Sequence, residues 1–343
     1  MIKRTLYFGN PAYLSLRNSQ LVIHLPEANG MDDRTGNNTI PVEDIGVVIL
    51  DHKQITITHG LMEALLENNT AVITCDSSRM PVGLLLPLSG NTVQSERFQA
   101  QIDSSLPLRK QLWQQTIQNK ITNQAYVLKS KRNVVVKNML AWVNDVKSGD
   151  SDNLEGRAAA YYWANMFPMI PDFRRGREGV TPNNLLNYGY AILRAIVARS
   201  LVASGLLPTF GIHHHNRYNA YCLADDIMEP YRPFVDQLVV EITDDIITRT
   251  VHHSNRQEQS LNNNENLIAA DKIPIYRTSN TENPIENIEL SKEIKAKLLG
   301  IPVLDVNING QRSPLMIAVG QTTASLTKCY LGELRKISYP SFT

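Results

Sequence analysis

The sequence predicts an α+β protein with a small β-rich domain at residues 1–93 and a larger, mainly α-helical domain at residues 94–343. Short β-branched or leucine-rich runs, separated by turn residues, fill the first ninety positions. From Gln94 onward, apolar residues instead recur every three to four positions, which is the period of amphipathic helices. A chain of 343 residues is long enough to bury a core in either one large or two ordinary domains.

The N-terminal region reads as five strands and one helix. Turn residues such as Gly9-Asn10-Pro11 and Asn29-Gly30 separate the predicted strands, which are residues 4–8, 20–25, 46–50, 71–75 and 81–86. Residues 58–68 carry apolar side chains at the spacing of one amphipathic helix. This region holds no catalytic group of residues.

The C-terminal region reads as a series of helices. One apolar stripe is formed by Leu112, Trp113, Ile117, Ile121, Ala125 and Leu128. Residues 183–204 form the clearest helix, and Gly205 gives its C-terminal stop. We expect Arg194 and Arg199 on this helix to meet acids of residues 225–245.

Further along the chain, residues 258–266 are polar and Asn-rich and predict a mobile loop. Two more helices are expected at 290–299 and 315–334, the second with Met316, Val319, Leu326 and Leu331 facing inward.

Composition restricts the class of protein. Net charge is +1, so no global basic field indicates a nucleic-acid partner. The three cysteines, Cys75, Cys222 and Cys329, lie far apart, which suits buried thiols in a reducing compartment. No N-terminal apolar segment follows the first residues, and no run reaches membrane-spanning length. We therefore expect a cytoplasmic protein.

Basic residues are nevertheless segregated. Residues 104–144 contain no Asp or Glu, and residues 173–179 form a loop with three arginines and two glycines. A one-signed basic stretch is the local pattern expected for phosphate binding, whereas a solvated helix face would usually interleave both signs. The predicted DNA contacts are Arg109, Lys110, Lys120, Lys129, Lys131, Arg132, Arg174, Arg175 and Arg177.

Residues 211–233 concentrate groups that can bind a metal: three histidines, two adjacent aspartates and a glutamate. Carboxylate and imidazole together suit Mn²⁺, Mg²⁺, Fe²⁺ or Zn²⁺. Successive residues point in different directions, so His213, His214 and His215 cannot all reach one ion. Asp226 and Glu229 share a helix face if a helix begins near Asp226, with Pro230 in its first turn. A solvated histidine turn before an ordinary helix start is the alternative.

Glu155 also has two interpretations. Asp152 and Glu155 have the spacing of a capping box, in which the Glu side chain folds back onto the N-cap and is not available to bind a metal. The other interpretation makes Glu155 a ligand.

Several phrases resemble the integrase subunit of CRISPR adaptation systems. They are G-I-H-H at 211–214, C-L-A-D-D-I-M-E-P-Y-R-P-F-V-D at 222–236, N-N-L-L-N-Y-G-Y-A-I-L-R at 183–194, E-G-R at 155–157 and S-L-T-K-C-Y at 325–330. The likeness is greatest to the type II branch, which accompanies the single-protein RNA-guided effector nuclease.

The resemblance implies a metal-dependent endonuclease and integrase that inserts short foreign duplexes into a CRISPR array. It implies that Glu155, His214 and Glu229 hold Mg²⁺ or Mn²⁺ and form the catalytic centre, with Asp225 and Asp226 orienting His214 or a water. Some family members use an Asp as the third ligand, so Asp226 remains the alternative to Glu229. The resemblance also implies a homodimer formed through the β-rich domain, a smaller companion subunit, and double-stranded DNA as substrate.

Two other functions are compatible with the chain. A catalytically inactive DNA-binding scaffold would explain the basic stretches, but the complete set of ligands argues against it. A metal phosphohydrolase acting on small substrates is disfavoured because the chain has no glycine-rich phosphate loop.

Overall fold

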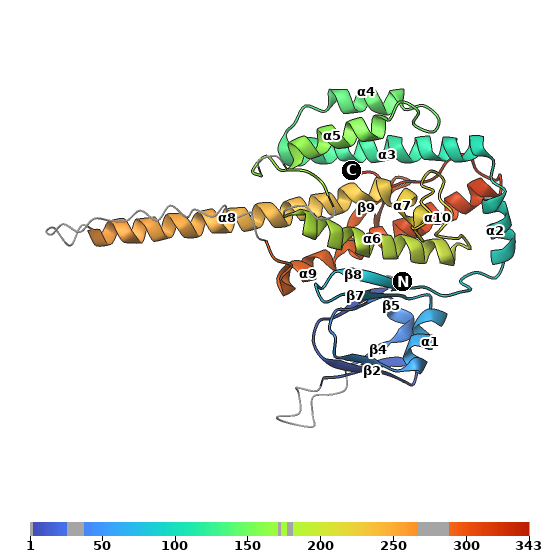
Figure 1. The fold of residues 1–343 in the computed structure, drawn as a ribbon, viewed down its shortest axis with the longest axis horizontal. Helices are drawn as coiled ribbons and strands as arrows, with labels where there is room; N and C mark the ends of the chain where they lie inside the picture. The colour runs from blue at the N-terminus through green and yellow to red at the C-terminus, as the bar shows by residue number, and fades with distance from the viewer. Residues whose placement is uncertain (1–2, 26–37, 171–172, 177–180, 266–287, 343) are drawn as a thin grey trace.

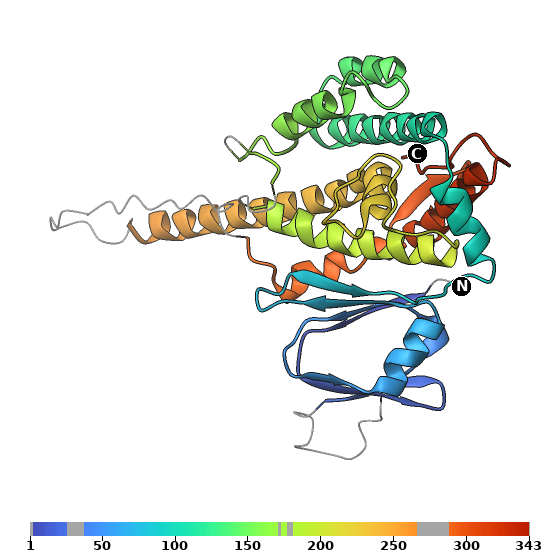
Figure 2. The same ribbon diagram turned by 45° about the vertical axis from the view of Figure 1, so that its right-hand side comes forward.

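The computed structural model describes residues 3–25, 38–170, 173–176, 181–265 and 288–342. The chain forms three layers (Figures 1 and 2): a β-rich region at one end, a central group of helices, and an outer layer made by α3, α4 and α5. The α+β class is confirmed. The predicted Asn29-Gly30 turn lies outside the described residues.

The β-rich region contains two four-stranded sheets and helix α1 (His59–Glu67). The first sheet has the order β1-β5-β7-β8, in which β1 (Arg4–Phe8), β5 (Ile45–Leu50) and β7 (Ala71–Cys75) are parallel and β8 (Pro81–Leu85) is antiparallel. The second has the order β4-β3-β2-β6, comprising β4 (Asn38–Pro41), β3 (Gln20–His24), β2 (Ala12–Arg17) and β6 (Ile55–Ile57). All five expected strands are present, but β2, β4 and β6 were not expected.

The first sheet joins the two halves of the molecule, because successive side chains of a strand point to opposite faces. Val47 and Ile49 belong to the same apolar cluster as the helices, whereas Val48 between them belongs to a separate cluster with α1. The chain changes from strands to helices near residue 93, but the first sheet shares an apolar core with the helices. A division into two domains at this residue therefore remains a prediction.

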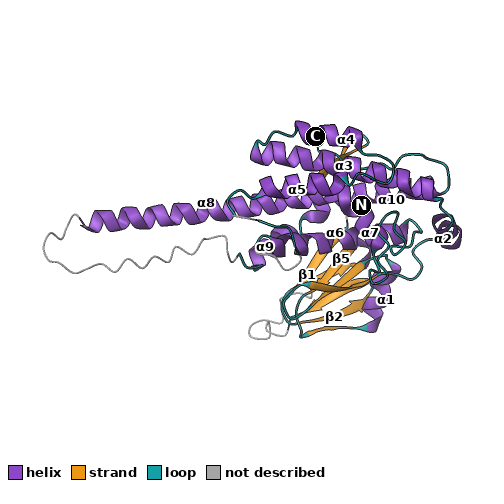
Figure 3. Ribbon diagram, turned by 45° about the horizontal axis from the view of Figure 1, so that its top comes forward, coloured by secondary structure: helices purple, strands orange, loops and turns teal. Residues whose placement is uncertain are grey.

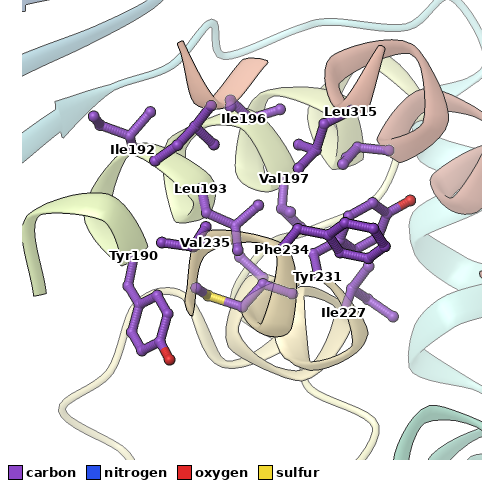
Figure 4. Packing of buried hydrophobic residues seen from close by; sticks show 14 of the residues in the cluster. Tyr190, Ile192, Leu193, Ile196, Val197, Ile227, Tyr231, Phe234, Val235 and Leu315 are labelled. Atoms are coloured by element: carbon purple, nitrogen blue, oxygen red, sulfur yellow. The ribbon is translucent and has the colours of Figure 1, made fainter. Parts of the chain in front are cut away.

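The helical part is built around α6 (Asn183–Ala203), which packs against α7 (Cys222–Met228), α8 (Arg232–Glu265) and α10 (Leu315–Tyr330) (Figure 4). The outer layer comprises α3 (Leu106–Arg132), α4 (Lys137–Asp145) and α5 (Leu154–Met166). Helix α2 (Gln94–Ile102) connects the halves, and α9 (Lys292–Leu298) and the hairpin β9 (Asp305–Ile308) and β10 (Gln311–Pro314) precede α10. Helix α8 projects from the body (Figure 3).

Three expectations about the helices are corrected. Residues 258–265 continue helix α8 instead of forming a loop. Leu331 lies just beyond α10 and is exposed, so it does not face inward. Arg194 does pair with Asp225, at 2.6 Å, but Arg199 donates to the Asn69 carbonyl of the β-rich region instead of meeting an acid.

By length and composition, α6 could cross a membrane, contrary to the expectation that no run was long enough. Most of its apolar stretch is buried among the other helices, as expected of a core helix.

Candidate active site

Helix α3 forms one wall of the candidate site. Trp113, Lys120 and Asn123 follow each other at spacings of seven and three residues, so they lie on one face of the helix. The Trp113 ring stacks on His213 with centroids 4.2 Å apart. The Asn123 amide donates to the carbonyl oxygens of Pro230, at 2.8 Å, and Pro340, at 3.0 Å. These contacts fix the histidine turn and the Glu229 segment against the same helix.

Glu155 is the second residue of helix α5, and its side chain is not used for capping. The Asp150 carboxylate accepts from the backbone N–H groups of Leu154 and Glu155, at 2.9 and 3.0 Å, and the Asn153 side chain accepts from Gly156. Asp152 instead pairs with Lys147 at 2.7 Å. Of the two interpretations of Glu155, the capping box with Asp152 is therefore wrong, because the side chains of Asp150 and Asn153 satisfy the helix N-terminus.

Glu229 opens a short 3-10 turn, η3 (Glu229–Tyr231), between α7 and α8. The expected helix start near Asp226 is wrong, because α7 begins at Cys222 and Pro230 lies in this turn. The side chain of Glu229 is only 6% exposed. Its Oε1 lies 3.0 Å from Arg232 Nε, one turn further along the chain.

Lys120 lies between the two glutamates. Its Nζ is 2.6 Å from Glu155 Oε1, to which it donates a hydrogen bond, and 2.6 Å from Glu229 Oε2. The contact with Glu229 is an ion pair without hydrogen-bond alignment, so among the described residues Glu229 Oε2 has no hydrogen-bond partner. Two carboxylates from segments 74 residues apart thus converge on one buried cationic atom.

The charges in this group support each other. Burial would raise the pKa of Glu229, but Arg232 and Lys120 outweigh burial and hold that pKa below its usual value. Burial would likewise lower the pKa of Lys120, but Glu229 and Glu155 raise it instead. The ammonium and the Glu229 carboxylate are therefore both charged at neutral pH.

His214 lies in the turn between α6 and α7, and Asp226 fixes its orientation. Asp226 is fully buried, and its Oδ1 lies 2.5 Å from His214 Nδ1. The same carboxylate accepts from the backbone N–H groups of His213, at 2.9 Å, and His214, at 3.3 Å. The hydrogen bond to Asp226 raises the pKa of His214, while burial raises the pKa of Asp226. Because Nδ1 is engaged, Nε2 is the ring nitrogen left to bind an external group.

Gly211 begins this turn, and nothing larger fits there. A Cβ at this position would lie 2.7 Å from Asp226 Oδ2 and 3.2 Å from the Cys222 Cβ. Asp225, although adjacent to Asp226, does not contact His214: it binds Arg194, at 2.6 Å, and the Asn219 amide, at 2.7 Å. Of the two predicted roles, orienting His214 or a water, the first is wrong for Asp225, since Asp226 is the carboxylate that contacts His214.

The predicted DNA contacts fall into different environments. Lys110, Lys129 and Arg174 are exposed, and Arg109 is partly buried. Lys131 pairs with Glu241 at 2.6 Å, and Arg132 makes two bonds to Asp244, at 2.8 and 2.9 Å. Arg175 is partly buried, donates to Asn183 and Asn187 and lies over the Tyr190 ring. Arg177 lies outside the described residues. Lys120 is buried between Glu155 and Glu229 and is removed from the set of surface contacts.

Three residues of the site were not predicted as such: Trp113, Lys120 and Arg232. A signal for Lys120 exists in the sequence, because it falls inside the apolar stripe of α3, where a lysine requires a buried counter-charge. Arg232 follows Glu229 by three residues, a spacing at which helical ion pairs form. The stacking of Trp113 on His213 joins residues 100 positions apart and has no local signal.

The donor set fits a divalent cation. Two glutamate oxygens and one imidazole nitrogen suit Mn²⁺ and, with less preference for nitrogen, Mg²⁺. The buried Glu229 Oε2 is in contact with the Lys120 ammonium, at 2.6 Å, so an ion could bind this oxygen if the ammonium moved away. Within the described ranges no three His, Cys, Asp or Glu side chains are already gathered at metal-binding spacing. Lys120 Nζ lies between the two glutamates in this arrangement.

Comparison with known proteins agrees with the sequence resemblance. The chain is 38% identical over 243 residues to a CRISPR-associated endonuclease Cas1 from Neisseria meningitidis serogroup C, covering 71% of this chain and 76% of the relative. Among solved structures, a casposase bound to integration product has a TM-score of 0.68 at 21% identity and covers 98% of this chain and 92% of that one. A Cas6-RT-Cas1–Cas2 complex has a TM-score of 0.65 at 20% identity and covers 97% and 35%. These two structures share the fold.

A family model described as "CRISPR associated protein Cas1" matches residues 6–269, which is well over half of the chain. The identity with the Neisseria relative independently supports the same assignment. The chain therefore belongs to the Cas1 family of CRISPR-associated proteins.

Proposed function

We propose that this protein is a metal-dependent DNA endonuclease and integrase that inserts short foreign duplexes as new spacers into a CRISPR array. The observation that carries the proposal is the convergence of Glu155 and Glu229 on one cationic position, next to a histidine held by Asp226. A relative named as an endonuclease, and the fold of a casposase bound to integration product, support DNA cleavage and joining as the class of reaction.

In this proposal Glu155, Glu229 and His214 Nε2 hold Mg²⁺ or Mn²⁺. A divalent ion at such a site polarises the scissile phosphate and neutralises charge in the transition state. Arg232 keeps Glu229 ionised and fixed in place, and Asp226 keeps the His214 ring oriented with Nε2 available. Because Asp226 is already occupied by His214 and two backbone N–H groups, its geometry supports Glu229 as the third ligand.

The reaction is a transesterification. The 3′-hydroxyl oxygen of the incoming DNA forms a bond to a phosphorus of the repeat, the bond from that phosphorus to the neighbouring 3′-oxygen breaks, and the proton of the attacking hydroxyl is released. The DNA supplies the nucleophile, so no protein side chain needs to form a covalent intermediate. The protein contributes orientation and electrostatic stabilisation.

The DNA backbone contacts fall to the exposed members of the basic stretch, namely Lys110, Lys129 and Arg174. Lys131 and Arg132 pair with Glu241 and Asp244, so they are less available to displace counterions from phosphates. A homodimer and a smaller companion subunit complete the proposed complex. The Cas1–Cas2 composition of one structural relative supports the companion subunit.

The nucleophile provides the test. Donor duplexes ending in 2′,3′-dideoxy nucleotides should bind with normal affinity but give no joined product on a supercoiled repeat-containing plasmid with Mn²⁺. Matched donors with a 3′-hydroxyl should transfer their label to the plasmid. Equal nicking by both donors, with no label transferred, would indicate hydrolysis by water and overturn the integrase proposal.

A further inference from the structure

Lys120 is placed where a lysine would not be expected in a metal-binding centre. The residue is 7% exposed, and its Nζ is 2.6 Å from a carboxylate oxygen on each side. It does not arrive from a loop: it projects from the middle of the 27-residue helix α3, whose neighbouring residues on the same face are buried. The ammonium is therefore a fixed part of the interior.

Removing this cation would leave the two glutamates facing each other. Glu229 is almost fully buried, and two ionised carboxylates held this close repel strongly unless a positive charge separates them. Arg232 cannot take over this role alone, because the contact recorded for it in the site is with the opposite oxygen, Oε1 of Glu229, and not with Glu155. Among the residues that the structure describes, Lys120 is the cation that contacts both carboxylates.

A divalent ion and the ammonium require the same oxygens. With both present, three positive charges would be shared by two carboxylates, in addition to Arg232 on Glu229. A divalent ion and an ammonium that contact the same carboxylate oxygens lie within a few ångströms of each other. In a site that water reaches poorly, their repulsion amounts to several times the thermal energy. The lysine side chain is a flexible four-carbon stem, so its Nζ can withdraw while the α3 backbone stays in place.

We propose that Lys120 is a built-in counter-cation that holds Glu155 and Glu229 together in the metal-free protein and is displaced when a divalent ion binds. The inference rests on the proposed function, in which these glutamates are metal ligands. It assigns Lys120 a positioning role: the binding geometry is preserved without metal, at the cost of weaker metal affinity.

Removing the charge at position 120 should strengthen metal binding and destabilise the metal-free protein, and the two changes can be measured separately. In full-length Lys120→Met, Mn²⁺ measured by electron paramagnetic resonance titration should bind about tenfold or more tightly than in wild type, because the competing cation is gone. In EDTA the melting temperature of Lys120→Met should fall, and saturating Mn²⁺ should raise it by more than it raises that of wild type. Lys129→Met, an exposed lysine on the same helix, is the matched control and should show neither change.

Equal or weaker Mn²⁺ binding in Lys120→Met would overturn the proposal, because the lysine would then not compete with the ion. If Lys120→Met fails to fold without metal, Lys120→Gln, which is one atom shorter than lysine but keeps a hydrogen-bond donor, is used in the same titration. Crystals of wild type grown in EDTA and in Mn²⁺ give a second measurement. Nζ should contact both carboxylates in EDTA and leave at least one of them in Mn²⁺, and an unmoved Nζ beside a bound ion would contradict displacement.

The same titration distinguishes failure of the inference from failure of the proposed function. If neither wild type nor Lys120→Met binds Mn²⁺, or if binding is unchanged by Glu155→Gln, the glutamates are not metal ligands and the proposed function fails. If Mn²⁺ binds wild type in a manner that depends on Glu155, but Lys120→Met binds no more tightly, only the role of Lys120 is wrong.

Discussion

In the described part of the chain two buried lysines pair with carboxylates, one inside the helical part and one where the first sheet meets α9, and the two groups are built differently. In the helical part, Lys120 faces two glutamates beside a histidine that is 45% exposed. Where the first sheet meets α9, Lys295 Nζ lies 2.6 Å from a single carboxylate, Asp51, which also accepts from the Tyr7 hydroxyl. The rings of Tyr7 and Tyr188 lie 5.8 and 5.5 Å from the Lys295 ammonium.

The difference lies in how each carboxylate group is neutralised. Lys295 and Asp51 are both almost completely buried and join segments 244 residues apart, and the half-exposed Arg79 lies further from the same carboxylate, at 3.9 Å. Such a pair fixes one arrangement of two segments, and breaking it leaves an uncompensated buried charge. Lys120 is instead shared by two glutamates, and Arg232 contacts the other oxygen of Glu229, so withdrawal of the Lys120 ammonium alone would expose one oxygen of each glutamate to a divalent ion. The first group is suited to holding the fold together, and the second to exchanging its cation.

The largest effect should come from the group of Lys120, Glu155 and Glu229. Glu155→Gln or Glu229→Gln preserves shape but removes an anionic ligand, so donor joining should fall by at least about 10³-fold. Duplex affinity, measured by gel shift, should change little because phosphate contacts lie elsewhere. Asp152→Asn, on a nearby carboxylate that pairs with Lys147, is the control and should retain normal joining. Near-normal joining in either glutamine variant would show that the altered glutamate is not a catalytic ligand.

Changes to the Lys295–Asp51 pair should affect stability instead of chemistry. Asp51→Asn leaves Lys295 buried without its counter-charge and should lower the free energy of unfolding by about 3–5 kcal/mol in urea titrations. Replacing both partners, with Asp51→Leu and Lys295→Met, should recover most of that loss. The exposed pair Arg312–Asp305 gives a control, since Arg312→Met should have little effect on stability. A loss of donor joining in folded Asp51→Asn protein would show that the two groups are not independent.

A smaller effect is expected at Asp226, which acts through His214. Asp226→Asn weakens the hydrogen bond to Nδ1, so metal affinity and joining should fall about 10–100-fold, as for other residues that orient metal ligands. This loss should be smaller than that of Glu229→Gln in the same assay. Asp226→Asn being as inactive as Glu229→Gln would favour Asp226 as the third ligand.

The smallest effect concerns another buried carboxylate, Asp236, which accepts hydrogen bonds from two tyrosine hydroxyl groups. Tyr162 and Tyr190 donate to it at 2.9 and 2.5 Å. Burial raises the pKa of Asp236 to about 6. Since the folded protein then binds this proton more tightly than the unfolded chain, Asp236 should lower stability as pH rises from about 4 to 6, by about 2–3 kcal/mol.

In Asp236→Asn this contribution disappears. The stability of the variant relative to wild type should therefore improve by about 2 kcal/mol between pH 4.5 and 7.5 in urea titrations. Parallel pH profiles for the two proteins would show that the tyrosine hydroxyls stabilise the ionised carboxylate as well as water does.

The sequence predicts periodic elements well and tertiary partners poorly. The apolar stripe of α3 and the extent of α6 follow from local spacing, and both are confirmed. Strand β2 was missed because it has only two buried side chains, Ala12 and Leu14, so it lacks the longer apolar run that marks strands such as β5 and β7. Asp152 and Glu155 have capping-box spacing, but Asp150 and Asn153 cap the helix instead, a choice that depends on the conformation of the preceding turn.

Lys120 shows the same limit at the site. As a lysine in a basic helix it was predicted to contact DNA, and only the arrival of Glu155 and Glu229 from other elements reveals its environment. The family resemblance directed attention to Glu155, His214 and Glu229. Their grouping depends on how α3, α5 and the α7–α8 junction pack together, which no local pattern encodes.

The turn at Gly211 limits how this protein can be varied. Its backbone does not require glycine, since Gly211 is not among the residues with positive φ. The restriction is one of space, because any side chain would displace the Asp226 carboxylate and the backbone that carries His214. Position 211 therefore accepts a single amino acid, and engineered or naturally drifting variants can explore the neighbouring exposed positions of the turn but not this one.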